Sequence, residues 1–320
     1  MWAFNITEWH MTEEEYERGR SLLLPEESVR VGKFIFEKDR KSALAGRLMI
    51  RRLIHEVLKV NYKTIPLIRT KEKKPCLDFS RLPDHATSRF PFFNFNLSHQ
   101  ADWVILVSEP EYLLGVDVMK IEVGGRQRPV SEFFYNLRRC FTAFEWMQIY
   151  DQDRYSPHDW TRDMVEARSV FPGLPVCDHK SLSYFMRFWT LKEAYIKAVG
   201  IGLGMELQDF YFRHLNPARR LPLSRDEFDE DLGHTDAEVC VRGEWKLHWT
   251  FKQVELDEDH IVAMAYGPRQ ESLQTFLETF ITGAASPSGD PVPSLFAPLP
   301  DSPNVFSVLS PADLFPKQHT

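Results

Sequence analysis

Cysteine is scarce in this chain of 320 residues, and the scarcity narrows the class of protein. The four cysteines, Cys76, Cys140, Cys177 and Cys240, are widely scattered. No pair has the short spacing of a zinc knuckle, and four cysteines in a chain of this length are too few for a disulfide scaffold. We therefore expect reduced, mostly buried thiols and a cytoplasmic protein.

Long hydrophobic runs, a targeting segment and an excess of positive charge are also missing. No run of about 18 apolar residues is present, which predicts no membrane span. The first residues turn acidic at once, unlike a signal peptide. The net charge of −7 and the pI near 5.9 disfavour a protein whose whole surface grips nucleic acid. An anionic ligand would need a local cluster of basic residues.

The composition that remains is ordinary for a globular protein, with 43% hydrophobic and 27% charged residues. Residues Lys38 to Leu58 have apolar side chains at helical spacing, and Ala43, Ala45 and Gly46 would let another element approach closely. The alternation in FFNFNLSH predicts a strand with Asn94, Asn96 and Ser98 on one side. The next two apolar runs, ADWVILVSE and LLGVDVMKIE, predict a hairpin that turns at Pro110-Glu111.

The second half of the chain repeats this mixture of helices and strands. The pattern between Pro129 and Val170 is mainly helical, and a stronger helix from Phe185 to Val199 stops at Gly200. Late strands are predicted in EVCVRGEWKLHWTFKQVEL and HIVAMAY. Strands and helices in both halves predict an α+β fold of two related lobes.

The C-terminal part differs from everything before it. From about Ile281 onwards it holds eight of the 21 prolines, mixed with Ser, Gly and Asp. Such a composition cannot bury enough apolar surface to offset chain entropy, which predicts a disordered tail. The alternative is that a short apolar pair in the tail, such as Val305-Phe306 or Leu314-Phe315, docks on the folded part of the protein. We divide the chain into an N-terminal lobe (1–112), a C-terminal lobe with the metal site (113–270) and the tail (271–320).

Asp117 is the first candidate for chemistry, since it lies inside the apolar strand LLGVDVM. A carboxylate in such a strand is costly unless a cation or several donors meet it. Two interpretations are equally good at this point: a structural ion pair with an arginine, or a metal ligand.

Glu193 and Lys197 are four residues apart on the predicted helix and therefore share a face. An exposed Glu–Lys pair would be worth only a few tenths of a kcal/mol. The helix is rich in aromatic residues, however, so we expect it to be buried. A buried helix that carries a glutamate and two lysines favours a functional site.

Basic residues gather in the first half of the chain. The run from Arg69 to Lys74 precedes the strand that His99 closes, and Arg30, Arg47, Arg51 and Arg52 add positive charge. A lone basic run is usually a solvated loop, and a lone histidine at a strand end is usually structural. Together these groups could hold a polyphosphate through charge-assisted hydrogen bonds.

Three segments in this order resemble the successive motifs of the Sfp-type 4'-phosphopantetheinyl transferases: NLSH (96–99), GVDVMK (115–120) and FWTLKEAYIKAVGIGLG (188–204). KDRKSALAGRLMIRRL resembles the first-lobe helix of the same family. The details are closest to the animal members that serve L-aminoadipate-semialdehyde dehydrogenase. The similarity runs from the N-terminus to about Tyr266 and does not cover the tail.

The resemblance implies two similar lobes related by a pseudo-twofold axis, with coenzyme A bound between them. Asp117 and Glu193 match Mg²⁺ ligands, Glu193 also matches the proposed general base, and Lys197 matches the lysine near the pyrophosphate. Asp117, Glu193 and Lys197 are thus the expected catalytic residues. The expected coenzyme A-binding residues are these three together with Arg30, Arg69, Thr70, Lys71, Glu72, Lys73, Lys74, Asn96, Leu97, Ser98 and His99.

One position departs from the bacterial pattern of this family. Bacterial members usually carry an acidic residue two positions after the strand aspartate, where this chain has Met119. We expect a water, held by Gln100, in place of a third protein ligand.

The activity implied by the resemblance is Mg²⁺-dependent transfer of phosphopantetheine from coenzyme A to a serine of an acyl or peptidyl carrier domain. Expected partners are the carriers of fatty-acid synthase, of mitochondria and of aminoadipate-semialdehyde dehydrogenase, with the enzyme a monomer that binds neither nucleic acid nor membrane. Three alternatives are weighed: a coenzyme A-binding adaptor without catalysis, another Mg²⁺-dependent phosphotransferase, and a nucleic-acid-binding module.

Overall fold

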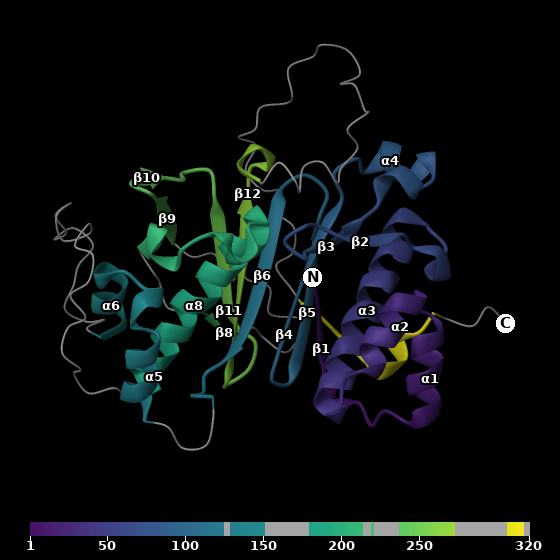
Figure 1. Cartoon of the computed structure of the whole chain (residues 1–320), viewed down its shortest axis with the longest axis horizontal. Helices are drawn as coiled ribbons and strands as arrows, with labels where there is room; N and C mark the ends of the chain where they lie inside the picture. The colour runs from purple at the N-terminus through teal and green to yellow at the C-terminus, as the bar shows by residue number, and fades with distance from the viewer. Residues whose placement is uncertain (125–128, 151–178, 214–218, 221–236, 273–305, 317–320) are drawn as a thin grey trace, which may run out of the picture.

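Two lobes, each a β-sheet with one long helix against it, make up the described part of the chain (Figure 1). The computed structural model describes residues 1–124, 129–150, 179–213, 219–220, 237–272 and 306–316. No helix among these residues is both long enough and apolar enough to cross a membrane. No disulfide joins the three described cysteines, Cys76, Cys140 and Cys240, and Cys177 lies outside the described residues.

The first lobe is built on a four-stranded sheet in the order β13-β1-β5-β4. Its strands are β1 (Trp2–Asn5), β4 (Asn94–Gln100), β5 (Trp103–Glu109) and β13 (Ser307–Leu309). The long helix α3 (Glu37–Leu58) confirms the predicted helix to within one residue. The remaining elements are η1 (Ile6–Glu8), α1 (Glu13–Ser21), α2 (Pro25–Gly32), η2 (Tyr62–Thr64), β2 (Leu67–Arg69), β3 (Pro75–Leu77), η3 (Phe79–Arg81), α4 (Asp84–Arg89) and η9 (Pro311–Leu314).

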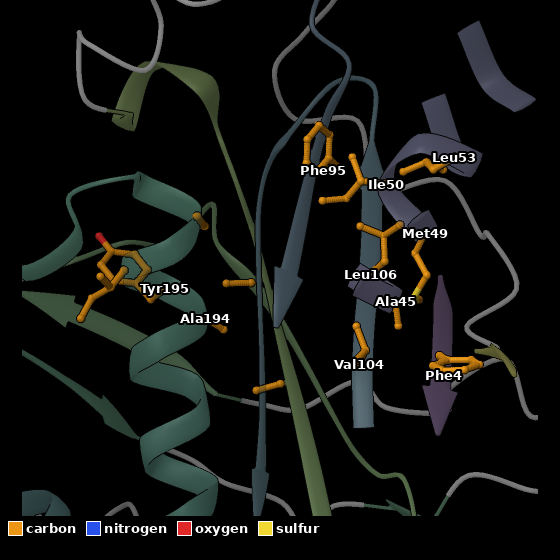
Figure 2. Packing of buried hydrophobic residues seen from close by; sticks show 14 of the residues in the cluster. Phe4, Ala45, Met49, Ile50, Leu53, Phe95, Val104, Leu106, Ala194 and Tyr195 are labelled. Carbon is orange, nitrogen blue, oxygen red and sulfur yellow. The ribbon is translucent and has the colours of Figure 1, made fainter. Parts of the chain in front are cut away.

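Small residues let α3 lie close to this sheet, as the sequence predicted. A Cβ on Gly46 would come within 2.8 Å of the Leu97 side chain on β4, so only glycine fits without a shift. Figure 2 shows Ala45 and Met49 of α3 on the side that faces Val104 and Leu106 of β5. All of these positions except Leu97 are buried, and together they form the core of the first lobe.

The second lobe is built on a sheet in the order β6-β12-β11-β8. Its strands are β6 (Leu113–Lys120), β8 (Arg219–Arg220), β11 (Thr250–Glu255) and β12 (His260–Gly267). A smaller sheet holds β7 (Phe210–Arg213), β9 (Glu238–Val241) and β10 (Glu244–Trp245). The helices are α5 (Val130–Asn136), η4 (Arg138–Cys140), α6 (Ala143–Tyr150), α8 (His179–Val199), η6 (Gly202–Gly204), η7 (Leu207–Asp209) and η8 (Arg269–Glu271). These elements confirm the mixed fold, although part of the predicted helical stretch, residues 151–178, lies outside the described residues.

The glycine in GVDVMK has a packing role, because α8 crosses β6 at this point. A Cβ on Gly115 would lie 1.9 Å from the carbonyl oxygen of Ala194 and 2.5 Å from the amide of Ala198. Backbone therefore touches backbone, and any side chain would push α8 away from the strand. The helix ends as predicted at Gly200, whose φ of 84° is in the left-handed region that favours glycine.

The predicted hairpin of the two apolar runs is wrong. β5 pairs with β4 and β1 in the first sheet, whereas β6 pairs with β12 in the second. Pro110-Glu111 therefore lies in the connection between the lobes, and the hairpin is formed by β4 and β5. Turn residues predict a reversal of the chain but not the sheet to which the next strand belongs.

Polar side chains of β4 join the two sheets where their edges meet. The backbone amides of Val116, Val118 and Lys120 on β6 donate to side-chain oxygens of Asn96 (2.9 Å), Ser98 (3.3 Å) and Gln100 (2.7 Å), respectively. Alternate residues of a strand share one face, which is why these three acceptors follow one another along β4. Two residues of the polar face predicted for FFNFNLSH, Asn96 and Ser98, thus belong to a row of hydrogen bonds between the lobes that Gln100 continues, whereas Asn94 donates to the carbonyls of Glu109 and Tyr112.

A short C-terminal segment, residues 306–316, packs on the first lobe beside α1, α2 and α3 (yellow in Figure 1). β13 pairs in parallel with β1, and Leu314 is fully buried. The Leu314 carbonyl accepts a hydrogen bond from Tyr62, and Asp313 forms an ion pair with Arg52. The prediction of a disordered tail is therefore wrong for this segment, because its few apolar residues find a preformed surface. Residues 273–305 and 317–320 lie outside the described part.

Candidate active site

Asp117, Ser98 and Lys197 meet where β6, β4 and α8 come together. The Lys197 ammonium donates to Asp117 Oδ1 (2.6 Å) and to Ser98 Oγ (3.0 Å), and Ser98 Oγ donates to the same Asp117 oxygen (2.9 Å). One residue comes from the first lobe and two from the second. The ion pair predicted as an alternative for Asp117 exists, but its partner is this lysine rather than an arginine.

The second oxygen of Asp117 has no hydrogen-bond partner among the described residues, although it is buried. A buried carboxylate oxygen without a donor is costly, so its presence in the interior of β6 needs an explanation. Hard cations such as Mg²⁺ bind oxygen ligands of this kind. This oxygen is therefore suited to bind a cation that is not part of the polypeptide.

Glu193 lies on the least buried stripe of α8. Between Phe185 and Val199, only Trp189, Glu193 and Lys197 are half-buried, and their spacing of four places them on one face. Burial raises the pKa of the Glu193 carboxyl, the negative charge of Asp117 raises it further, and Lys197 opposes both. Two acids thus lie close enough to affect each other, and no hydrogen bond or ion pair from the described residues engages Glu193.

Lys192, the residue before Glu193, has a structural role instead. Lys192 is fully buried, forms an ion pair with the buried Glu145 of α6 (2.9 Å), and donates to the carbonyls of Leu207 and Phe210. Of the two lysines in the predicted motif, one therefore anchors α8 inside the second lobe and the other faces Asp117. This anchoring helps to fix the position of Glu193 relative to β6.

Three arginines of the first lobe form a basic cluster: Arg30 on α2, Arg47 on α3 and Arg69 at the end of β2. Burial lowers the pKa of Arg47, and the positive charges of Arg69 and Arg30 lower it further. Arg69 is exposed by surface area, yet enough protein surrounds it to lower its pKa, and the positive charge of Arg30 lowers it further. Glu27 opposes this, but its carboxylate already accepts hydrogen bonds from Arg51 and from the Leu24 amide. Grouped like charges of this kind fit an anionic ligand.

Arg47 is the residue of this cluster that the site prediction omitted. Sequence reasoning counted it only as general positive charge, whereas in the structure it is near enough to Arg30 and Arg69 for their positive charges to lower its pKa. Its guanidinium makes one described hydrogen bond, to the Ala43 carbonyl of its own helix (2.7 Å).

His99 is near both the basic cluster and Asp117, one of the two acids, Asp117 and Glu193, that we call the acidic pair. By surface area it is exposed, yet enough protein surrounds the imidazole to lower its pKa, and the positive charges of Lys197 and Arg47 lower it further. It therefore lies within the electrostatic reach of both groups. This position is compatible with the predicted contact to coenzyme A, which remains a prediction.

The turn from Arg69 to Lys74 separates into exposed and buried side chains. Arg69, Lys71 and Lys73 are exposed and Glu72 is half-buried, whereas Thr70 and Lys74 are buried. Lys73 has a φ of 70°, and its amide donates to the Thr70 carbonyl to close the turn. The Lys74 ammonium contacts backbone carbonyls of α8 and β6, so the structure does not show it turned toward a nucleotide.

The β4 residues predicted to bind coenzyme A are largely occupied within the protein. Asn96 is buried and accepts from Val116, and Leu97 packs on Gly46. The oxygen of Gln100 accepts from Lys120, which leaves it one lone pair for the predicted water. Met119 lies two residues after Asp117 and therefore on the same face of β6, so a thioether occupies the position of the acidic residue in bacterial members.

Comparison with known proteins follows the two lobes. The family described as "4'-phosphopantetheinyl transferase, N-terminal" matches residues 7–111, and the "4'-phosphopantetheinyl transferase superfamily" matches residues 113–265. The L-aminoadipate-semialdehyde dehydrogenase-phosphopantetheinyl transferase of Mus musculus is 37% identical over 266 residues, which is 82% of this chain and 73% of the relative. The chain belongs to the 4'-phosphopantetheinyl transferase superfamily.

Two further relatives of this transferase differ in their sequence identity to it. A phosphopantetheinyl transferase of Thraustochytrium sp. is 35% identical over 82% of this chain and 77% of its own length. The 4'-phosphopantetheinyl transferase Sfp of Bacillus subtilis is 25% identical over 63% of this chain and 71% of its own. The chain is thus a phosphopantetheinyl transferase enzyme, and the matched residues include all three predicted catalytic side chains.

Proposed function

We propose that this transferase moves the 4'-phosphopantetheine arm of coenzyme A to a serine of an apo carrier domain, with Mg²⁺ bound by Asp117 and Glu193. The single observation that carries the proposal is the pair of carboxylates, one from β6 and one from α8, beside a lysine and a basic cluster. The chemistry balances: the serine oxygen bonds to the β-phosphorus, the pyrophosphate bond breaks, and adenosine 3',5'-bisphosphate leaves.

The carboxylates present fit the metal. Mg²⁺ is usually held by one or two carboxylates together with waters and substrate phosphates. Asp117 Oδ2 has no donor, and the Glu193 carboxylate is not engaged by another described side chain. When bound, Mg²⁺ would neutralise negative charge on the pyrophosphate. Within the described part of the chain no three His, Cys, Asp or Glu residues are grouped so that they could hold a metal ion together, and we propose these two carboxylates as the protein ligands.

Glu193 is the residue that we propose accepts the serine proton. A carboxylate with a raised pKa is a stronger base than an ordinary glutamate, and both burial and the charge of Asp117 raise the pKa of Glu193. Its place on the half-buried stripe of α8 keeps it reachable. The proton that leaves the carrier serine would go to this carboxylate, directly or through a water.

Lys197 and the basic cluster are proposed to bind the phosphates. The Lys197 ammonium lies on Asp117, so a phosphate oxygen there would receive a charge-assisted hydrogen bond as negative charge develops. Arg30, Arg47, Arg69 and His99 would hold the 3'-phosphate end at the other side of the site. The charge of the cluster supports an anionic ligand, since Glu27, the carboxylate that opposes Arg47 and Arg69, already accepts hydrogen bonds from Arg51 and from the Leu24 amide.

The test is a transfer reaction read by mass. The full chain is incubated with coenzyme A, Mg²⁺ and an apo carrier domain, and the carrier is weighed by mass spectrometry. A phosphopantetheine mass addition that EDTA abolishes is expected, and a carrier variant with Ala for its serine must remain unmodified. Coenzyme A binding without any mass addition would identify an adaptor instead and contradict the proposal.

The carriers and the setting are part of the proposal. The name of the Mus musculus relative and its 37% identity support a carrier of the aminoadipate-semialdehyde dehydrogenase type, and carriers of fatty-acid synthase and mitochondria are the further candidates. We also propose that the enzyme is a cytosolic monomer.

A further inference from the structure

Lys74 is a buried lysine whose side chain crosses from one lobe to the other. It belongs to the turn between β2 and β3 in the first lobe, and 8% of its surface is exposed. Its ammonium donates to the carbonyl of Lys197 (2.7 Å), with the carbonyls of Ala198 (3.4 Å) and Leu114 (3.5 Å) nearby. The first two carbonyls belong to α8 and the third to β6, both in the second lobe.

The two α8 carbonyls lie in the last turn of that helix, where carbonyls lack partners within the helix. When Lys74 is protonated, its charge at the helix C-terminus is also favoured by the helix dipole. Lys74 therefore serves as a cap supplied from outside the helix. It acts where α8 touches β6 most closely, at Gly115, which is next to Leu114.

The capped turn is the one that carries the active-site lysine. The carbonyl of Lys197 accepts from Lys74, while the side chain of the same residue contacts Asp117. The turn that supplies Lys74 also supplies Arg69 to the basic cluster, and hydrogen bonds between Thr70 and residues 73 and 74 fix its shape. One turn thus links the basic cluster to the acidic pair.

We propose that Lys74 is a positioning residue of the transfer step, which holds the last turn of α8 so that Lys197 stays beside Asp117. The inference rests on the proposed function for its effect on turnover. It differs from the role implied by family resemblance, in which Lys74 would contact coenzyme A. A positioning residue affects kcat, whereas a ligand of coenzyme A affects its affinity.

Lys74→Met tests the proposal, because it keeps the length of the side chain and removes its donors. We expect kcat for carrier modification to fall about tenfold or more, since small displacements of aligned groups are expensive. The Kd for coenzyme A, measured by calorimetry, should stay close to that of the wild type. Lys63→Met is the matched control, since Lys63 is an exposed lysine of the same lobe, and it should change neither value.

Hydrogen–deuterium exchange gives a second readout that does not depend on activity. In Lys74→Met the amides of residues 197–200 should exchange faster, while those of α3 stay protected. Should this variant not fold, Lys74→Gln, which keeps a donor on a shorter side chain, takes its place and should give the same changes to a lesser degree. A weaker Kd with kcat retained, or unchanged kcat and exchange, overturns the proposal. A wild-type chain without transfer refutes the proposed function alone, because the exchange result stands by itself.

Discussion

At the scale of single residues, the site is defined by which charges have partners. Lys192 and Glu145 form an ion pair inside the second lobe, and Arg51 forms one with Glu27, although the Arg51 Nε has no hydrogen-bond partner among the described residues. Asp117 Oδ2 and Glu193 are left without donors among the described residues. Sequence reasoning could identify Asp117 and Glu193, because a carboxylate in an apolar strand or a buried helix is unusual. It could not separate Lys74 from its exposed neighbours, since that depends on the shape of one turn.

Arg47 should contribute to coenzyme A affinity. Arg47→Gln removes one of three clustered guanidiniums, and the loss of a charge-assisted hydrogen bond is worth roughly 1.5–3 kcal/mol. We expect the Kd for coenzyme A, measured by calorimetry, to rise about tenfold or more. Arg81→Gln changes an exposed arginine elsewhere in the first lobe and is the control. Equal affinities of the two variants would remove Arg47 from the site.

Lys74 should make stability depend on pH in one direction. Burial lowers the pKa of Lys74 to about 7, well below the value of an exposed lysine. Between about pH 7 and 10 the unfolded chain then binds a proton that the folded chain lacks, so the free energy of unfolding rises with pH by up to about 1.4 kcal/mol per unit. The Lys74→Met variant has no titrating group at this position, so this contribution to the free energy of unfolding is absent from it. Urea unfolding at pH 7 and pH 9 should show a larger gain for the wild type, and parallel curves would contradict the shift.

At the scale of elements, β5 and β6 show why the hairpin was predicted wrongly. Both strands are apolar runs, and the Pro110-Glu111 pair between them is a good turn signal. β6 instead belongs to the second sheet, and it meets the first sheet through side chains of β4 rather than through backbone carbonyls. The sequence showed the polar residues on one side of the strand, but it could not show that backbone amides of another sheet would be their donors.

The row of hydrogen bonds between β4 and β6 should be measurable in stability. Asn96→Ala leaves the Val116 amide buried without an acceptor, which costs about 1–3 kcal/mol. Denaturant unfolding of the variant should show a lower free energy of unfolding by this amount. Asn136→Ala, at the exposed end of α5, is the control and should stay within about 0.5 kcal/mol of the wild type. A loss for Asn96→Ala as small as that of the control would mean that water replaces the side chain.

At the scale of the whole molecule, contacts far apart in sequence hold the two lobes and the C-terminal segment together. β13 lies about three hundred residues after β1 and still pairs with it, and Arg52 contacts Asp313. Composition predicted that the tail could not form a core of its own, and this holds physically for so short a segment. What composition could not reveal is that the first lobe already offers an apolar surface and a strand edge to receive it.

The docked segment should contribute to stability through its buried residues. Leu314→Ala empties a fully buried position, and such changes cost about 2–5 kcal/mol when the element cannot leave its site. The cost here is limited by the free energy of docking, because the segment can detach. We expect a clearly lower Tm and faster proteolysis of the C-terminal end. Val308→Ala, an exposed position in the same segment, should behave as the wild type, and an equal response of both would argue against docking.

The central claim is that Asp117 and Glu193 together hold one divalent ion beside coenzyme A. Electron paramagnetic resonance of Mn²⁺, titrated into the full chain with coenzyme A present, measures this directly. The wild type should bind one ion per chain, and Asp117→Asn and Glu193→Gln should each weaken that binding by about tenfold or more. Glu206→Gln, which changes an exposed glutamate, should bind as the wild type does. Undiminished Mn²⁺ binding in either site variant, with coenzyme A still bound, would contradict the account.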